Sequence, residues 1–237
     1  MTPAVVRHGV RSIMRMSRTA QGTLDILSTP QKAASMVGNL TPDIAQRVHG
    51  NLTRALRLVH VAARGEQFED VSALRLFILD VARTVNRGIT KSDAAFRKGD
   101  ADQYAYVPAE HLSWRFPEFC EELFLRLAEQ GDPRVLAAWV EYRVDLTDHF
   151  FADGCGRCAK VLSALPLLRH HVLLPDYTEG GTVSEDDVRA RYYSFNDHAL
   201  HRKRHGEDAV FDRAAWARWL AYYLCLFPTW QPVSVVL

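Results

Sequence analysis

The densest group of chemically active side chains lies between residues 149 and 160. His149 can accept a proton from a hydroxyl group at neutral pH, because the pKa of an unperturbed imidazole lies close to neutrality. Asp153 offers carboxylate oxygens, which together with phosphate oxygens are the ligands that Mg²⁺ prefers. A base and a magnesium ligand this close together are typical of phosphoryl or nucleotidyl transfer. The segment reads HFFADGCGRCAK in one-letter code.

Two glycines and two cations in the same segment favour a phosphate-binding turn. Gly154 and Gly156 lack a Cβ atom where a helix is expected to begin, so free backbone N–H groups can surround an anion there, helped by the helix dipole. Arg157 and Lys160 lie three positions apart at the opening of that helix and can neutralise further phosphate oxygens. The sequence therefore predicts a phosphate cradle directly after the base and the metal ligand.

The pair Cys155 and Cys158 also suits a redox or zinc site, because its spacing is that of a Cys-x-x-Cys motif. Only one such pair occurs, however, and a closed zinc site needs four ligands. A zinc deaminase is excluded by motif order, since the His-x-Glu sequence at residues 205 to 207 follows the cysteine pair instead of preceding it. With Cys120 and Cys225, the four cysteines are not spaced like a disulfide scaffold, which favours a reducing cytoplasm.

Helical periodicity on both sides of the segment predicts the elements that position it. Apolar residues recur at three- and four-residue steps after Thr41-Pro42, after Asp70 and after Asp132-Pro133, and each of these is a favourable helix start. The third helix, residues 133 to 148, runs directly into the segment, and an apolar helix then continues to about residue 168. Two more helices are predicted, one from Ser184 and one over residues 212 to 227. The predicted fold class is therefore mainly α.

Residues 97 to 117 interrupt the helical pattern. Glycine and proline residues surround a short alternating stretch, residues 104 to 107, which predicts a small β-hairpin or flap. Pro117 then leads into a helix over residues 119 to 130. Tyr104 and Tyr106 either guide a target segment or cover the core, and the sequence leaves both readings open.

The composition is that of one folded domain preceded by a basic tail. The 237 residues are 48% hydrophobic and 24% charged, and 29 basic against 28 acidic residues leave a net charge of +1. Such a balanced chain has no field of one sign to attract nucleic acid or a membrane surface, and its apolar stretches are too short to span a membrane. Residues 1 to 40 are basic up to Asp25 and are expected to form a tail, with delivery to a host cell as the alternative.

The segment at residues 149 to 160 resembles the signature of the Fic family, His-Pro-Phe-x-Asp/Glu-Gly-Asn-Gly-Arg-x-x-Arg. A looser likeness extends over residues 70 to 200 and includes Arg191-Tyr192-Tyr193. The resemblance implies a Fic-type helical bundle with a small β-hairpin flap, formed by residues 41 to 237. The matching positions are His149, Phe151, Asp153, Gly154, Gly156 and Arg157.

The same resemblance implies an activity and a set of site residues. The activity is transfer of AMP, or another nucleoside monophosphate, from ATP or another Mg²⁺-bound nucleotide to a Ser, Thr or Tyr hydroxyl of a target protein. In this family pattern His149 is the general base and Asp153 binds Mg²⁺. The residues expected to bind the nucleotide are Gly154, Cys155, Gly156, Arg157 and Lys160.

Three positions depart from the signature. Phe150 replaces proline, which is expected to alter only the stiffness of the loop. Cys155 replaces an asparagine that orients the α-phosphate in the family, and a thiol is a poorer donor. Lys160 replaces the second arginine and keeps the charge without the bidentate geometry. The alternative function is therefore a catalytically weakened Fic-fold module that binds nucleotide or protein.

Two further features of the family bear on its reaction and its regulation. Gly156 is the residue found in AMP-transferring members, whereas the phosphate-transferring Doc branch has lysine there, so nucleotidyl transfer is favoured. Many members carry an inhibitory helix with the pattern Ser/Thr-x-x-x-Glu-Gly/Asn. Glu179-Gly180 does not match it, because Pro175 stands four residues before the glutamate. The resemblance thus implies either an unrestrained protein or a small antitoxin-like inhibitor as a separate partner.

Overall fold

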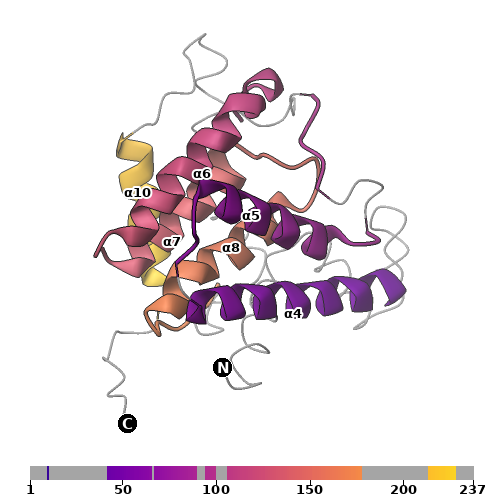
Figure 1. Cartoon of the computed structure of the whole chain (residues 1–237), viewed down its shortest axis with the longest axis horizontal. Helices are drawn as coiled ribbons and strands as arrows, with labels where there is room; N and C mark the ends of the chain where they lie inside the picture. The colour runs from indigo at the N-terminus through magenta and orange to yellow at the C-terminus, as the bar shows by residue number, and fades with distance from the viewer. Residues whose placement is uncertain are drawn as a thin grey trace.

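The computed structural model describes residue 10 and residues 42–65, 67–89, 94–99, 106–177 and 213–227. These parts are mostly helical, with loops at residues 94–99 and 171–177, and no strand occurs among them. The elements are α4 (Pro42–Arg64), α5 (Val71–Asn86), the 3₁₀ turn η1 (Ala109–His111), α6 (Leu112–Ala128), α7 (Pro133–Glu141), the π-helical segment η2 (Tyr142–Thr147), α8 (Cys155–Arg169) and α10 (Arg213–Cys225). Helix α8 lies in the middle of the molecule, where α4, α5 and α7 pack against it (Figure 1).

Helices α4 and α5 form a pair that supports α8. Asp70 caps α5, since its Oδ1 accepts a hydrogen bond from the Ala73 amide at 2.7 Å. Asn51 of α4 donates to two backbone carbonyls at the C-terminal end of α5, at 3.2 and 2.9 Å. This contact fixes the position of Asn86, the last residue of α5. Both predicted helices are confirmed, and the stripe of α4 is fully buried at Val48, Leu52, Leu56 and Val59.

Helix α7 and segment η2 together lead into residues 149 to 160. Asp132 caps α7 by accepting from the Arg134 amide at 2.9 Å, with Pro133 in the first turn as predicted. From Tyr142 to Thr147 the chain winds as a π-helix, a feature that the sequence pattern did not predict. The Thr147 hydroxyl donates to the carbonyl of Tyr142 at 3.1 Å within this winding. Such π-helical turns occur frequently at functional sites.

Helix α6 begins earlier than the sequence predicts. The expected helix started after Pro117, but α6 runs from Leu112 to Ala128 with Pro117 inside it. A proline at that depth costs the helix one backbone hydrogen bond. Leu112 and Phe116 are 2% and 1% exposed, and the burial of these two side chains in the core offsets the loss.

Phe150 and Phe151 anchor the segment in the aromatic core. Phe150 packs against Phe116 and Phe119, with ring centroids 5.2 and 5.3 Å apart. Phe151 stacks on Phe96 at 5.9 Å and forms an isolated antiparallel bridge with it. Phe150 therefore does more than change the stiffness of the loop, because it is a fully buried core residue.

The remaining sequence predictions divide into those that the structure describes and those that it does not. The C-terminal helix is confirmed as α10, where Trp219 and Tyr223 are buried. Val10, the one described residue of the expected tail, lies in the core at 1% exposed. No helix of the described parts is long and apolar enough to cross a membrane. Outside the described residues lie the helix from Ser184, Arg191-Tyr192-Tyr193, and the part of the predicted hairpin that includes Tyr104.

Candidate active site

Gly154 forms the turn at which the loop enters α8. Its φ of 70° lies in the left-handed region that favours glycine. A Cβ atom at this position would lie 2.1 Å from Oδ1 of Asn86, so a larger residue has no room. Asn86 also donates from Nδ2 to the carbonyl of Asp153 at 3.0 Å. The end of α5 therefore holds the loop in place beside the N-terminus of α8.

His149 has a defined tautomer in this structure. Its Nδ1 lies 3.0 Å from the backbone carbonyl of Asp145, and because a carbonyl only accepts, Nδ1 must carry the hydrogen. The lone pair of the neutral ring is then on Nε2. The ring stacks on Tyr106, with centroids 4.1 Å apart and planes 16° apart. Tyr106 thus covers one face of the imidazole, a contact that the sequence did not predict.

The environment of His149 keeps the imidazole neutral. Burial lowers its pKa below the ordinary histidine value, and the carboxylate of Asp145 opposes this effect. The side chain is still 22% exposed, so the ring is not sealed from a substrate. A neutral imidazole with a free Nε2 lone pair is the form that a general base requires.

Arg97 braces the loop that carries His149. Its guanidinium donates to the carbonyl of His149 at 3.2 Å and to that of Asp148 at 3.3 Å. It also donates to the carbonyls of Gly99, at 3.0 Å, and of Val107. The φ of His149 is 47°, a left-handed value that is uncommon for a residue with a side chain. The hydrogen bonds from Arg97 help to hold the backbone in this conformation.

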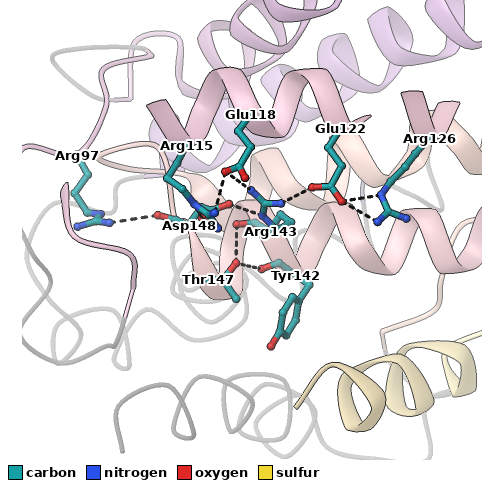
Figure 2. Close-up of polar contacts among 9 residues, drawn as sticks. All are labelled: Arg97, Arg115, Glu118, Glu122, Arg126, Tyr142, Arg143, Thr147 and Asp148. Carbon is teal, nitrogen blue, oxygen red and sulfur yellow. Dashed lines mark hydrogen bonds and ion pairs between the residues drawn. The ribbon is translucent and has the colours of Figure 1, made fainter. Parts of the chain in front are cut away.

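Asp148 forms the buried centre of an ionic network next to His149, whose outer members are partly exposed (Figure 2). Its carboxylate accepts from Nε of Arg115 at 3.0 Å and from Nε of Arg143 at 2.6 Å. Arg143 also donates to Glu122 of α6 at 2.8 Å. The network ties η2, and the residue that precedes His149, to α6.

Asp153 and Arg157 lie together at the start of α8. Oδ1 of Asp153 accepts from the Gly154 amide at 2.6 Å and lies 3.6 Å from Nη2 of Arg157. Asp153 is open to ligands, with its side chain 53% exposed, whereas that of Arg157 is 4% exposed. Nη2 of Arg157 donates to Asn86 at 3.4 Å, but its buried Nη1 has no hydrogen-bond partner in the described structure. A buried guanidinium nitrogen with nothing to donate to suits an anionic ligand.

Cys155 turns its thiol into the protein. The side chain is 2% exposed, and its Sγ accepts from the Phe151 amide at 3.1 Å, so it stabilises the loop from inside. Burial raises the pKa of Cys155 well above its ordinary value and that of Cys158 to about 12. Both are free thiols, and no cluster of three metal-ligating side chains occurs among the described residues. Only the backbone amide of Cys155 is therefore placed to contact a ligand.

Lys160 does not join the group at the start of α8. Its ammonium is buried 3.6 Å from Oδ2 of Asp145 and 4.0 Å from Oε2 of Glu141. The side chain is 2% exposed and also lies over the ring of Tyr177. Gly156 faces the same carboxylate, since a Cβ atom on it would lie 3.0 Å from Oδ2 of Asp145. The structure thus brings Asp153, Gly154 and Arg157 together at the start of α8, and it places His149, Gly156 and Lys160 around the carboxylate of Asp145.

Comparison with known proteins identifies the fold. No family model matches the sequence, and no curated protein matches it. A solved structure does: a Fic domain-containing signaling protein from Bacteroides thetaiotaomicron superposes with a TM-score of 0.62 and 16% identity, over 95% of this chain and 88% of that one. The chain has a Fic fold. The prediction of a mainly α, Fic-type bundle is confirmed, and at this identity the likeness establishes the fold alone.

Three residues of the Fic-fold site escaped sequence reasoning. Asn86 and Arg97 are distant in the chain from the loop that they hold, and nothing in their local pattern marks them. Asp145 lies within the predicted helix over residues 133 to 148, four residues before His149, a spacing at which two side chains share a helix face. That spacing is the one signal that could have indicated a partner for the base.

Proposed function

We propose that the protein transfers AMP, or another nucleoside monophosphate, from a Mg²⁺-bound nucleotide to a hydroxyl group of a target protein. The observations that carry this proposal concern two side chains of the segment at residues 149 to 160. In the described structure the hydrogen of His149 lies on Nδ1, which leaves the Nε2 lone pair to take a proton, and the buried Arg157 has an Nη1 donor without a hydrogen-bond partner. A neutral base and a cationic donor for an anion are what nucleotidyl transfer needs.

The residues at the start of α8 would hold the phosphates. The backbone amides of Cys155 and Gly156 belong to the first turn of a helix, where N–H groups lack intrahelical partners and the dipole favours an anion, whereas the amide of Gly154 already donates to Asp153. Arg157 adds a charged donor. Asp153 would hold Mg²⁺ with its exposed carboxylate, and the ion would neutralise charge between neighbouring phosphates.

The chemistry expected of the protein's own groups is a single displacement. Nε2 of His149 takes the proton from a Ser, Thr or Tyr hydroxyl, and that oxygen attacks the α-phosphorus. With ATP, a new P–O bond joins AMP to the target, the bond to the β-phosphate oxygen breaks, and pyrophosphate leaves. Burial of His149 favours the neutral ring that this step requires.

A second function is favoured by the positions of Cys155 and Lys160. The thiol of Cys155 points inward to Phe151, and the ammonium of Lys160 is buried beside Asp145, so neither side chain is placed to contact a phosphate. With fewer phosphate contacts, the protein would bind nucleotide, or a partner protein, without efficient turnover. In this alternative Arg157 and the turn at Gly154 still bind a ligand, but the transfer reaction does not proceed efficiently.

Intact-mass analysis separates the two functions. The purified chain would be incubated with Mg²⁺ and a mixture of nucleoside triphosphates, together with candidate target proteins. An added nucleoside monophosphate that disappears in His149→Ala but persists in His170→Ala supports transfer, since His170 is an exposed histidine at the far end of α8. Labelling that survives in His149→Ala would reject the assigned base.

Titration calorimetry with the same nucleotides addresses the alternative. Binding without labelling, unaltered by Cys155→Asn, supports the binding module. Strong labelling that appears only in Cys155→Asn would instead show that the native protein is a weakened transferase. The absence of both binding and labelling would contradict both functions.

A further inference from the structure

The carboxylate of Asp145 lies between the imidazole of His149 and the ammonium of Lys160. Its Oδ1 is 3.6 Å from Nδ1 of His149, and its Oδ2 is 3.6 Å from Nζ of Lys160. The residue is 1% exposed, so water screens neither contact. We propose that Asp145 is a positioning residue for His149, and that Lys160 serves as the counter-ion of Asp145 rather than as a ligand of phosphate.

Two contacts fix Asp145 to the imidazole. Its backbone carbonyl takes the hydrogen of Nδ1 at 3.0 Å, and its carboxylate stands on the same side of the ring. The carbonyl selects the tautomer, and the carboxylate stabilises the positive charge that the ring acquires when Nε2 takes a proton. One residue thus serves both the resting form and the protonated form of the base.

Gly156 makes room for this carboxylate. A Cβ atom at that position would lie 3.0 Å from Oδ2 and 3.4 Å from Oδ1 of Asp145, tighter than most Cβ contacts. Glycine is therefore favoured at position 156 on steric grounds, because a side chain there would crowd Asp145 on the inner face of α8. This is in addition to any contact of its backbone with a ligand.

The surroundings of Lys160 explain why it stays inside. Its Nζ donates to the carbonyl of Gly156 at 3.4 Å, and Glu141 lies on its other side at 4.0 Å. One oxygen of Glu141 already accepts from Ser163 at 2.9 Å and from the hydroxyl of Tyr177. Burial raises the pKa of Glu141, so Asp145 is the stronger candidate for the negative partner of the ammonium.

Arg97 and Asp153 are charged groups that also influence the imidazole of His149. The guanidinium of Arg97 lies on the backbone side of the residue, where it donates to the His149 carbonyl. The carboxylate of Asp153, in the loop before α8, raises the pKa of the imidazole. The neutral ring of Tyr106 stacks on one face of the imidazole. Among the groups that the structure describes around the imidazole, Asp145 is the acid that contacts Nδ1.

The role of Asp145 in catalysis rests on the proposed function, but its effect on the imidazole is measurable without any nucleotide. NMR titration of the full-length protein, with the His149 signal assigned by its loss in His149→Gln, reports the pKa of the ring. Asp145→Asn should lower this pKa by about one unit, a tenfold loss of proton affinity, because a neighbouring negative charge is removed. Asp80→Asn, at an exposed site on α5, should leave it unchanged.

A second variant covers the case in which Asp145→Asn alone does not fold, since it leaves the ammonium of Lys160 buried without that partner. The double change Asp145→Asn with Lys160→Met removes both charges and should also lower the pKa of His149, by a smaller amount. A His149 pKa that stays within about 0.3 units of the wild-type value in every variant that folds, as judged by circular dichroism, would overturn the proposal.

Thermal unfolding tests the pairing with Lys160. If the two residues are partners, the double variant is more stable than the sum of the two single losses predicts. Additive losses would overturn the assignment of Lys160. Both readouts are independent of turnover, so a protein that binds no nucleotide would reject the proposed function and leave the result for Asp145 intact.

Discussion

The side-chain amide of Asn86 contacts the carbonyl of Asp153 across 67 residues of sequence, at 3.0 Å. Through this bond the last residue of α5 fixes the position of the loop relative to the start of α8. The Oδ1 atom of the same amide faces both Gly154 and the guanidinium of Arg157. One side chain thus fixes the turn, the predicted metal ligand Asp153 and the arginine proposed to bind phosphate relative to each other.

Gly154→Ala should destabilise the protein and abolish nucleotide binding. The left-handed backbone costs alanine on the order of 1 to 2 kcal/mol, and its Cβ would push Asn86 out of place. Chemical denaturation measures the first effect and calorimetry the second. Gly131→Ala is the matched control, because a Cβ atom there meets nothing within 4 Å. Equal losses of stability in the two variants would contradict the role assigned to this turn.

Arg157→Met should weaken the binding of Mg²⁺-ATP at least tenfold, since the variant removes the buried donor that lacks a partner. The affinity is read by calorimetry at fixed ionic strength. Arg83→Met is a suitable control because Arg83 is an exposed residue of α5 paired only with Asp80 in the salt bridge shown by the structure. An unchanged affinity in Arg157→Met would show that the anion binds elsewhere.

The pH dependence of transfer should reflect the lowered pKa of His149. The base works only when neutral, and burial shifts its protonation to lower pH than for an ordinary histidine. The value of kcat/KM should therefore persist as the pH falls to the ordinary histidine range and be lost only below it. In Asp145→Asn this loss should move to still lower pH. Loss of activity above the ordinary value would contradict the environment described for the ring.

The thiols of Cys155 and Cys158 should resist alkylation in the folded protein. Both are buried and have raised pKa values, so little thiolate forms at neutral pH. Cys225 is exposed and provides the internal control within the same sample. Mass spectrometry after brief iodoacetamide treatment should show one readily labelled site among these three, and all of them labelled in denaturant. Rapid native labelling of Cys158 would revive the redox interpretation.

Local sequence patterns were sufficient for the helices and for the turn. The stripes of α4 and α5, the cap at Asp132 and the glycines before α8 each express a rule that operates within a few residues. For that reason most helices of the bundle, and the glycine turn before α8, could be predicted. The Fic-like signature added a functional expectation to the same positions.

Features that depend on packing across the fold could not be read in this way. Nothing near Asn86 or Arg97 in the sequence indicates which carbonyl groups they will reach. Lys160 looked like a phosphate ligand because it follows Arg157 by three residues, yet the structure turns its ammonium towards two buried carboxylates. Local rules place Pro117 at a helix start, but α6 begins at Leu112 and contains this proline. The burial of Leu112 and Phe116, which depends on the rest of the fold, stabilises the earlier start.

The π-helical winding of η2 gives the imidazole of His149 a structural role. The imidazole donates to the backbone carbonyl of Asp145 and so caps the C-terminal end of η2. The group that would accept a substrate proton therefore also stabilises the helix end that precedes it. In the proposed function, loosening of this helix end would displace the imidazole that takes the proton before the rest of the fold is disturbed. Any contact that changes this one turn would then change the rate of transfer without changing the residues proposed to bind nucleotide.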